Sequence, residues 1–168
     1  MSDIEVKGLA DLQRAMDELP AKLQKNVMRG ALRAGAKVLA AEARQLVPVA
    51  SGELRDTIRH SSKIENGVAI GYVRAGASKK SKKGWYVRFV EFGTAAHIIK
   101  VRKGRVLALG VSKVEHPGAK KQPFMRPALD RAGLRAVAAV GEYIRKRLAS
   151  KYGINVPAPE DSADGGDE

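Results

Sequence analysis

Apolar residues recur at helical spacing along the first third of the chain. Between Ala21 and Leu46 they occupy positions 23, 27, 31, 34, 38 and 41, three or four residues apart, as on one face of an amphipathic helix. Gly30 and Gly35 lie close to this face. Because small residues allow another backbone to approach closely, we expect this helix to pack tightly on a sheet or on a neighbouring copy of the chain.

Alternating patterns predict β-structure in the middle of the chain. Ile58 to Glu65 and Val68 to Arg74 flank Asn66-Gly67, the pair most typical of a two-residue hairpin turn, so a half-buried antiparallel hairpin is expected. Trp85 to Phe92 is apolar on both sides of an extended strand. Such a strand is central in a covered sheet or pressed against another subunit. A second hairpin is expected over His97 to Gly110, turning near Lys103-Gly104.

A second long helix is expected over Pro127 to Ala149, with an inner side formed by Leu129, Val137, Val140, Ile144 and Leu148. The elements together predict an α+β fold, in which two long helices pack on a four- to five-strand, mainly antiparallel sheet with a projecting hairpin or loop. At 168 residues the chain suits a single domain, which we place at residues 1–155. Residues 156–168 contain five acidic residues and no basic one, so an acidic, disordered tail is expected.

The charge of the chain is strongly positive. Removing the five acidic groups of the tail from the formal net charge of +13 leaves +18 on residues 1–155. Such a body attracts polyanions over a Debye length of about 8 to 10 Å, which points to nucleic acid or to the acidic surface of a partner protein. Well-solvated lysines on a soluble protein are the alternative explanation.

Several kinds of chemistry are not expected. The chain has no cysteine, which removes disulfides, thiolate catalysis and cysteine zinc sites. His60, His97 and His116 are scattered without metal-ligand spacing. Glu53 and Asp56 lie close together, but no second acidic pair accompanies them as a metal-dependent nuclease would require. We therefore expect no enzyme, no metal and no cofactor, and no membrane partner because no apolar run approaches the roughly twenty residues of a spanning helix.

Glu91 falls among apolar residues of the predicted strand, where an unpartnered carboxylate would be costly. We expect it to pair with Arg126 or Arg131, or to accept backbone N–H groups around Gly93-Thr94. An intersubunit salt bridge is the functional alternative. Gly93 is expected to take a positive φ that lets the chain turn after the strand.

Three segments in order give the chain a family resemblance: Ser51 to Ile58 following Val47-Pro48, Trp85 to Thr94, and Gln122 to Leu129. Over roughly residues 8 to 148 the chain resembles the head–tail neck and tail-completion proteins of long-tailed bacteriophages, the group related to the minor tail protein gpZ of lambda. We interpret Ser51 as a helix N-cap and Phe124 as a core anchor. The structural residues of the motifs are Ser51, Gly52, Leu54, Glu91, Phe92, Gly93, Thr94, Pro123, Phe124, Arg126 and Pro127.

The resemblance implies a virion protein that completes or terminates the tail and joins it to the head, usually as a ring and often of six copies, assembled in the host bacterial cytoplasm. Its expected partners are copies of itself, the head–tail connector or stopper proteins and the tail tube protein, with contact to DNA in transit. A non-specific DNA-binding protein that uses basic loops is the alternative. Candidate interface residues are Tyr86, Arg88, Val90, Phe92, Lys79, Lys80, Lys82, Lys83, Lys100, Arg102, Lys103 and Arg105.

Overall fold

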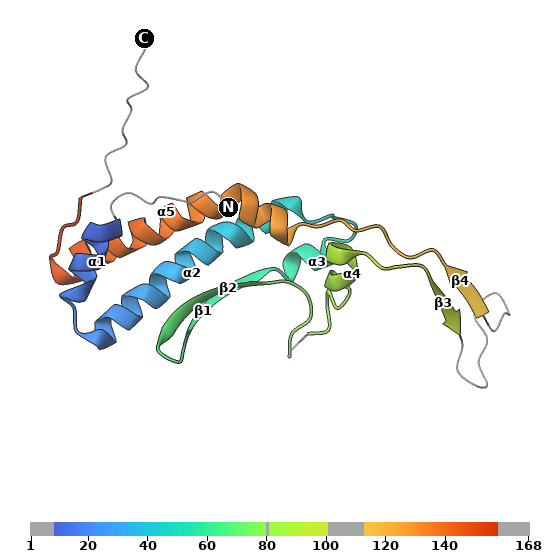
Figure 1. Cartoon of the computed structure of the whole chain (residues 1–168), viewed down its shortest axis with the longest axis horizontal. Helices are drawn as coiled ribbons and strands as arrows, with labels where there is room; N and C mark the ends of the chain where they lie inside the picture. Colours follow the sequence, from blue (N-terminus) through green and yellow to red (C-terminus); the bar gives the residue numbers. More distant parts are fainter. Residues whose placement is uncertain (1–8, 80, 101–112, 158–168) are drawn as a thin grey trace, which may run out of the picture. The chain divides into compact units, whose positions relative to one another are not determined.

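The computed structural model describes residues 9–79, 81–100 and 113–157. Contacts between residues divide the chain into two compact units, whose elements are labelled in Figure 1. Unit 1 comprises Met1–Leu39, His60–Val73 and Ala132–Glu168, and unit 2 comprises Ala40–Arg59 and Arg74–Arg131. Helices α2 (Ala21–Leu46) and α5 (Met125–Tyr152) contribute residues to both units. The single domain over residues 1–155 stays a prediction.

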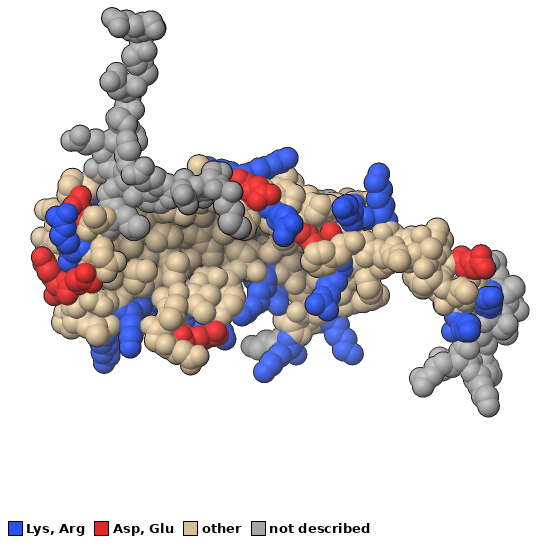
Figure 2. Space-filling view, in the orientation of Figure 1, with Lys and Arg blue, Asp and Glu red and all other residues tan. Residues whose placement is uncertain are grey.

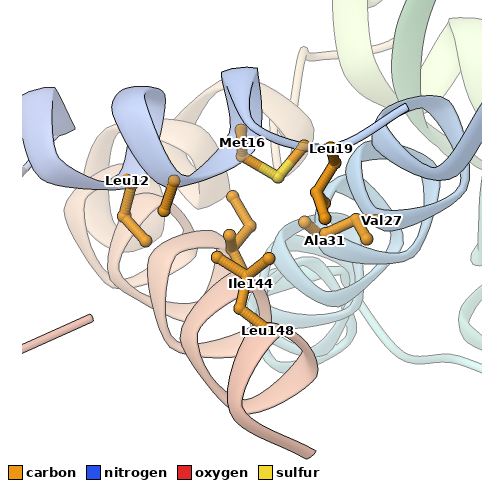
Figure 3. Packing of buried hydrophobic residues seen from close by; sticks show 8 residues of the cluster. Leu12, Met16, Leu19, Val27, Ala31, Ile144 and Leu148 are labelled. Atoms are coloured by element: carbon orange, nitrogen blue, oxygen red, sulfur yellow. The ribbon is translucent and has the colours of Figure 1, made fainter. Parts of the chain in front are cut away.

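Unit 1 has its core where three helices meet. Helix α1 (Leu9–Asp17) and the turn after it pack their apolar side chains against α2 and α5 (Figure 3). Figure 3 shows these side chains pointing toward one another from all three helices. The cluster consists of Leu12, Ala15, Met16, Leu19, Val27, Ala31, Ile144 and Leu148. Burying each of the larger ones contributes roughly 1.5–3 kcal/mol before the loss of conformational entropy.

Glycines bring α2 and α5 close together in unit 1. A Cβ added to Gly35 would lie 2.8 Å from Cγ2 of Val140 and 2.9 Å from the carbonyl oxygen of Ala136. A Cβ added to Gly30 would collide with the hydroxyl group of Tyr143. The tight packing predicted for α2 is therefore confirmed, but the element that the glycines accommodate is helix α5 rather than a sheet or a second copy.

The first hairpin is confirmed. Strands β1 (Arg59–Glu65) and β2 (Val68–Arg74) pair in a two-stranded sheet, and the turn residues Asn66 and Gly67 have φ values of 50° and 84°. Both central residues of a type I′ turn need such positive values. Beside α2 (Figure 1), a Cβ on Gly71 would lie 3.0 Å from the carbonyl oxygen of Leu32, so the absence of a side chain there lets β2 approach the helix.

Unit 2 contains the short helices α3 (Glu53–Asp56) and α4 (Val87–Phe92) and a second small sheet. In that sheet β3 (His97–Lys100) pairs antiparallel with β4 (Lys113–His116), with His97 opposite His116 and Lys100 opposite Lys113. The rings of His97 and His116 lie 5.0 Å apart. The second strand of this sheet thus lies beyond residue 110, where the predicted hairpin over residues 97–110 was expected to end. The turn predicted at residues 103–104 lies outside the described residues.

The strand predicted over Trp85–Phe92 was wrong, because this segment forms helix α4. Residues that are apolar on both sides of a strand also fit a helix, and Trp85, Phe89 and Phe92 are spaced as on one helical face. Glycines bound the segment on both sides, Gly84 with φ 67° and Gly93 with φ 70°. The amide of Gly93 donates to the carbonyl oxygen of Phe89 at 2.9 Å, so the helix ends at the glycine, whose positive φ confirms the prediction.

The mixed helix-and-strand class is confirmed, but the sheet differs from the expected one. Among the described residues the strands form two separate two-stranded antiparallel sheets, β1–β2 and β3–β4, in place of one sheet of four to five strands. The main reason is that the central strand of the expected sheet is helix α4.

The inner side predicted for the last helix was partly wrong. Ile144 and Leu148 are buried, whereas Leu129 is 56% exposed and Val137 39% exposed. Alanines at 128, 132 and 136 are the buried residues of this part of α5. The same shift occurs in α2, where Ala40 and Ala43 are buried and Ala41 is exposed.

Candidate assembly surface around helix α4

The Glu91 carboxylate binds the N-terminus of helix α5 within unit 2. One oxygen, Oε2, accepts hydrogen bonds from the backbone N–H groups of Phe124 and Met125 at 2.9 and 3.2 Å, and Oε1 accepts one from Arg126 at 3.4 Å. The first N–H groups of a helix lack partners within it, and a negative charge there is favourable for the helix dipole. Glu91 therefore anchors α4 to the start of α5. The expected backbone acceptor role is found, but with these residues rather than with Gly93-Thr94 or an arginine.

Backbone hydrogen bonds add a second connection on the same side of α4. Gln122 donates its N–H to the carbonyl oxygen of Val90 at 2.8 Å, and Thr94 and Ala119 exchange hydrogen bonds of 2.9 and 3.2 Å. A Cβ on Gly93 would lie 2.6 Å from the carbonyl oxygen of Ala119. The absence of a side chain at Gly93 lets residues 119–122 lie directly against the end of α4.

Phe124 follows this connection and is fully buried, as expected for a core anchor. Pro123 precedes it, and Arg126 and Pro127 lie in the first turn of α5. Glu91, Gly93 and Thr94 thus form one structural frame with residues 119–126 in unit 2.

The Ser51–Thr57 motif forms a second fixed element of unit 2. Gly52, with φ 80°, precedes α3, and the hydroxyl of Ser51 lies 3.4 Å from the amide of Glu53. Ser51 therefore does not provide the N-cap that was expected of it. Leu54 is buried. The hydroxyl of Thr57 donates a hydrogen bond to the carbonyl oxygen of Leu54 at 2.6 Å and accepts one from the N–H of Gly76 at 2.8 Å.

Helix α4 and the turn before it carry exposed aromatic side chains. Trp85 is 66% exposed, Phe89 47% and Phe92 74%. Trp85 contacts Phe89 edge-on, with ring centroids 5.8 Å apart. Aromatic side chains are among the largest apolar groups that a protein can bury, so exposing three of them within eight residues is unfavourable unless another molecule covers them.

A groove of about 430 Å³ lies beside these aromatic side chains. Tyr86, Phe89 and Val90 of the α4 segment form one part of its lining. Pro48, Val49 and Leu54 belong to a second part, and Ala119 to a third. We call this groove together with Trp85, Phe89 and Phe92 the α4 surface.

The predicted interface residues occupy several places. Tyr86 and Val90 line the groove, whereas Arg88 and Phe92 are exposed on α4. Exposed lysines are Lys79, Lys82, Lys83 and Lys100, and the ammonium group of Lys83 lies 3.9 Å from the carboxylate of Glu53. Lys80, Arg102, Lys103 and Arg105 lie outside the described residues.

Sequence reasoning omitted Trp85, Phe89 and Val49 from the interface, although all three are exposed in unit 2. The first two were expected on one side of a strand that is apolar on both sides. The helical spacing of residues 85, 89 and 92 was the signal that could have identified them.

The acidic and histidine side chains of the described residues are dispersed. Within the described residues, no three His, Asp or Glu side chains come together in a way that could hold a metal ion. Glu53 and Asp56 line a separate polar pocket of unit 2, where the guanidinium of Arg59 donates to the carbonyl oxygens of Gly76 and Ala77 at 2.8 and 3.1 Å. None of the helices described has the length and apolar character of a bilayer-crossing segment.

A family model with the description "Bacteriophage HK97-gp10, putative tail-component" matches residues 10–93, half of the chain. The chain belongs to this HK97-gp10-like family. The resemblance inferred from the motifs is thereby confirmed, and the protein is a bacteriophage tail component. The matched residues include α4 and its aromatic side chains but end before residues 119–126, which hold α4 in place. No curated protein and no solved structure gives a significant match to the chain.

Proposed function

We propose that this HK97-gp10-like protein is a structural component of the head–tail junction, which completes the tail and joins it to the head connector as a ring-forming oligomer. The single observation that carries the proposal is the exposure of Trp85, Phe89 and Phe92 on and next to a helix that Glu91 anchors to the start of α5. A tail component with a fixed, exposed apolar surface is suited to contact neighbouring subunits.

The energetic argument for an interface is direct. Burying a large apolar side chain contributes roughly 1.5–3 kcal/mol, and tryptophan is enriched among the residues that dominate binding energy at protein interfaces. The interface that we propose has Trp85 and Phe92 at its centre.

The shape of the α4 surface favours a ring over a symmetric pair. The surface combines protruding side chains, such as Trp85, with a groove lined by Pro48, Val49 and Tyr86. When one copy inserts its aromatic side chains into the groove of the next, the contact is heterologous, and heterologous contacts close into rings where the rotation allows. Lys79, Lys82, Lys83 and Lys100 would then be available for acidic surfaces of the connector or the tail tube.

The test is complementation of a phage that carries a nonsense mutation in this gene. The variant Trp85→Ala/Phe92→Ala removes two exposed side chains, so we expect folded protein with unchanged circular dichroism. We expect few joined particles by electron microscopy and a loss of infectious titre of at least about tenfold, which corresponds to roughly 1.4 kcal/mol of lost contact energy if titre scales with association.

Val68→Ala is the matched control, since Val68 is 62% exposed but belongs to unit 1, whereas the α4 segment belongs to unit 2. It should leave titre and particle yield unchanged. Joined, infectious particles at wild-type yield from the double variant would refute the proposed interface.

A further inference from the structure

A second groove, of about 820 Å³, lies entirely within unit 1. One side is formed by α2 over Leu23–Lys37, and the other parts are contributed by β1 and by the C-terminal half of α5. We call it the α2 groove. Its lining residues with polar side chains are Asn26, Arg29, Arg33, Lys37, His60, Ser62, Tyr143, Arg147 and Tyr152.

The α2 groove is cationic. Arg29, Arg33 and Lys37 recur every fourth residue of α2, which places successive charges about 6 Å apart along the helix. Arg147 adds a fourth cation from α5. All four side chains are exposed, and the lining contains no described Asp or Glu.

No salt bridge neutralises these four cations within the described part of the chain, where the ion pairs involve other residues. Basic side chains are also widespread over the face of the molecule seen in Figure 2, with acidic ones in a few small groups. Gathering like charges in one groove is unfavourable in the free protein. A bound polyanion would reverse that cost.

The neutral side chains of the groove narrow the chemistry of the ligand. Asn26, Ser62, Tyr143 and Tyr152 are of the types that, with arginine and lysine, donate hydrogen bonds to phosphate and sugar. Both tyrosines are partly buried and pack against the hydrophobic core of unit 1, so the groove offers hydrogen-bonding groups rather than a stacking platform. Gly30 also lines the groove and leaves the space that the hydroxyl of Tyr143 occupies, since a Cβ at position 30 would collide with it.

We propose that the α2 groove binds the phosphodiester backbone of nucleic acid without sequence preference. Three of its four cations are arginines, whose planar guanidinium groups fit phosphate oxygens through paired hydrogen bonds. The groove combines these guanidinium groups with the neutral polar side chains of Asn26 and Ser62, and such a mixture matches the phosphate and sugar groups of a nucleic-acid backbone. The groove is thus a different surface from the basic loops, and it belongs to a different unit from the α4 surface.

The test is the fluorescence anisotropy of a labelled random-sequence 20-base-pair duplex, and of the corresponding single strand, titrated with the full chain at several salt concentrations. In the variant Arg29→Gln/Arg33→Gln/Lys37→Gln we expect the slope of log K against log salt to fall in magnitude by about 2 to 3, since each lost phosphate contact removes about one. Comparing the duplex and single-strand titrations shows whether the groove prefers double-stranded or single-stranded nucleic acid.

The matched control is Lys79→Gln/Lys82→Gln/Lys83→Gln, which removes the same charge from a loop of unit 2. We expect its salt slope to change by less than about one. Equal losses in both triple variants would overturn the proposal, because net charge alone would then explain binding. The single variant Arg147→Gln tests the opposite side of the groove and should weaken binding of the probe measurably. It provides the test if the triple variant does not fold.

Competition identifies the class of ligand. Unlabelled DNA should displace the probe, whereas poly-glutamate of equal total charge should do so at least about tenfold less effectively. Equal competition would overturn the assignment to nucleic acid and indicate an acidic polypeptide. Trp85→Ala/Phe92→Ala should bind the probe like the unchanged protein, so this proposal and the head–tail proposal can fail independently.

Discussion

Replacing Glu91 tests the frame that holds the α4 surface. In Glu91→Ala the backbone N–H groups of Phe124, Met125 and Arg126 lose their acceptor. Loss of a helix N-cap costs about 0.5–2 kcal/mol, and loss of a negative charge at a helix N-terminus costs about 0.3–1 kcal/mol. Because Glu91 is only half-buried and water can partly replace it, we expect a loss of about 2 kcal/mol.

Glu91→Gln separates the charge from the hydrogen bonds. Its amide oxygen can still accept from Phe124 and Met125, while its amide nitrogen faces the N–H of Arg126 and cannot accept from it. Two neutral hydrogen bonds survive, and the charge and the third hydrogen bond are lost. We therefore expect about half the effect of Glu91→Ala, close to 1 kcal/mol.

The measurement is amide hydrogen exchange at Phe124, Met125 and Arg126, together with urea denaturation followed by circular dichroism. A loss of about 2 kcal/mol raises the exchange rate at these amides roughly thirtyfold, since about 1.4 kcal/mol corresponds to a factor of ten. Glu115→Gln is the control, because Glu115 is exposed and the change removes the same charge.

The reasoning would be refuted if exchange at the three amides in Glu91→Ala matched that in Glu115→Gln. Equal effects of Glu91→Gln and Glu91→Ala would contradict the assignment of hydrogen bonds to the remaining oxygen.

Three further predictions concern close packing. Gly35→Ala should lower the free energy of unfolding, measured by urea denaturation, by about 1–2 kcal/mol, since the new Cβ meets the backbone of Ala136. Gly133→Ala, whose new Cβ would have nothing within 4 Å, should raise it by about 0.5–1 kcal/mol. Changes of the same sign in both variants would contradict the packing. Gly93→Ala should lower the melting temperature, with a cost of at least about 2 kcal/mol from its positive φ and its contact with Ala119. Phe124→Ala should cost about 3–5 kcal/mol, and a value below about 1 would show that Phe124 is not a core anchor.

Local patterns predicted those elements that local chemistry determines. Helix α2 begins and ends at the predicted residues, Ala21 and Leu46. Its long amphipathic pattern determines the helix, and Pro48 ends it because the residue before a proline disfavours helical geometry. The first hairpin is equally local, since Asn66 and Gly67 tolerate the positive φ that a tight turn needs.

The buried faces of the long helices were harder to predict. Reasoning from large apolar residues placed Leu129 and Val137 inside, yet both are exposed. The α2–α5 packing in unit 1 instead uses small residues, since the missing side chain of Gly35 allows the backbone of Ala136 to approach. Where two helices approach this closely, small residues fill the interface, so a large hydrophobic residue is a poor guide to the inner face there, although Ile144 and Leu148 are buried further along α5.

The error at α4 has a long-range cause. A short segment with apolar side chains on both sides fits a strand as well as a helix, so the helical spacing of residues 85, 89 and 92 is a signal that does not decide between the two by itself. Hydrogen bonds from residues 122–126 to Val90 and Glu91 hold the segment, more than thirty residues away in sequence. The need for a partner at Glu91 followed from the cost of leaving a carboxylate without one, but which N–H groups it binds depends on the tertiary fold.

These contacts explain why the family-matched residues depend on the rest of the chain. Residues 10–93 contain all of α2 and α4, but Val27 and Ala31 of α2 share a core with Ile144 and Leu148 of α5. Likewise Glu91, inside the match, binds amides beyond it. A fragment ending at residue 93 would expose Val27 and Ala31. In the same fragment Glu91 would have no amides to bind and could not anchor α4. The fixed orientation of Trp85, Phe89 and Phe92, on which the proposed interface depends, is therefore a property of the longer chain.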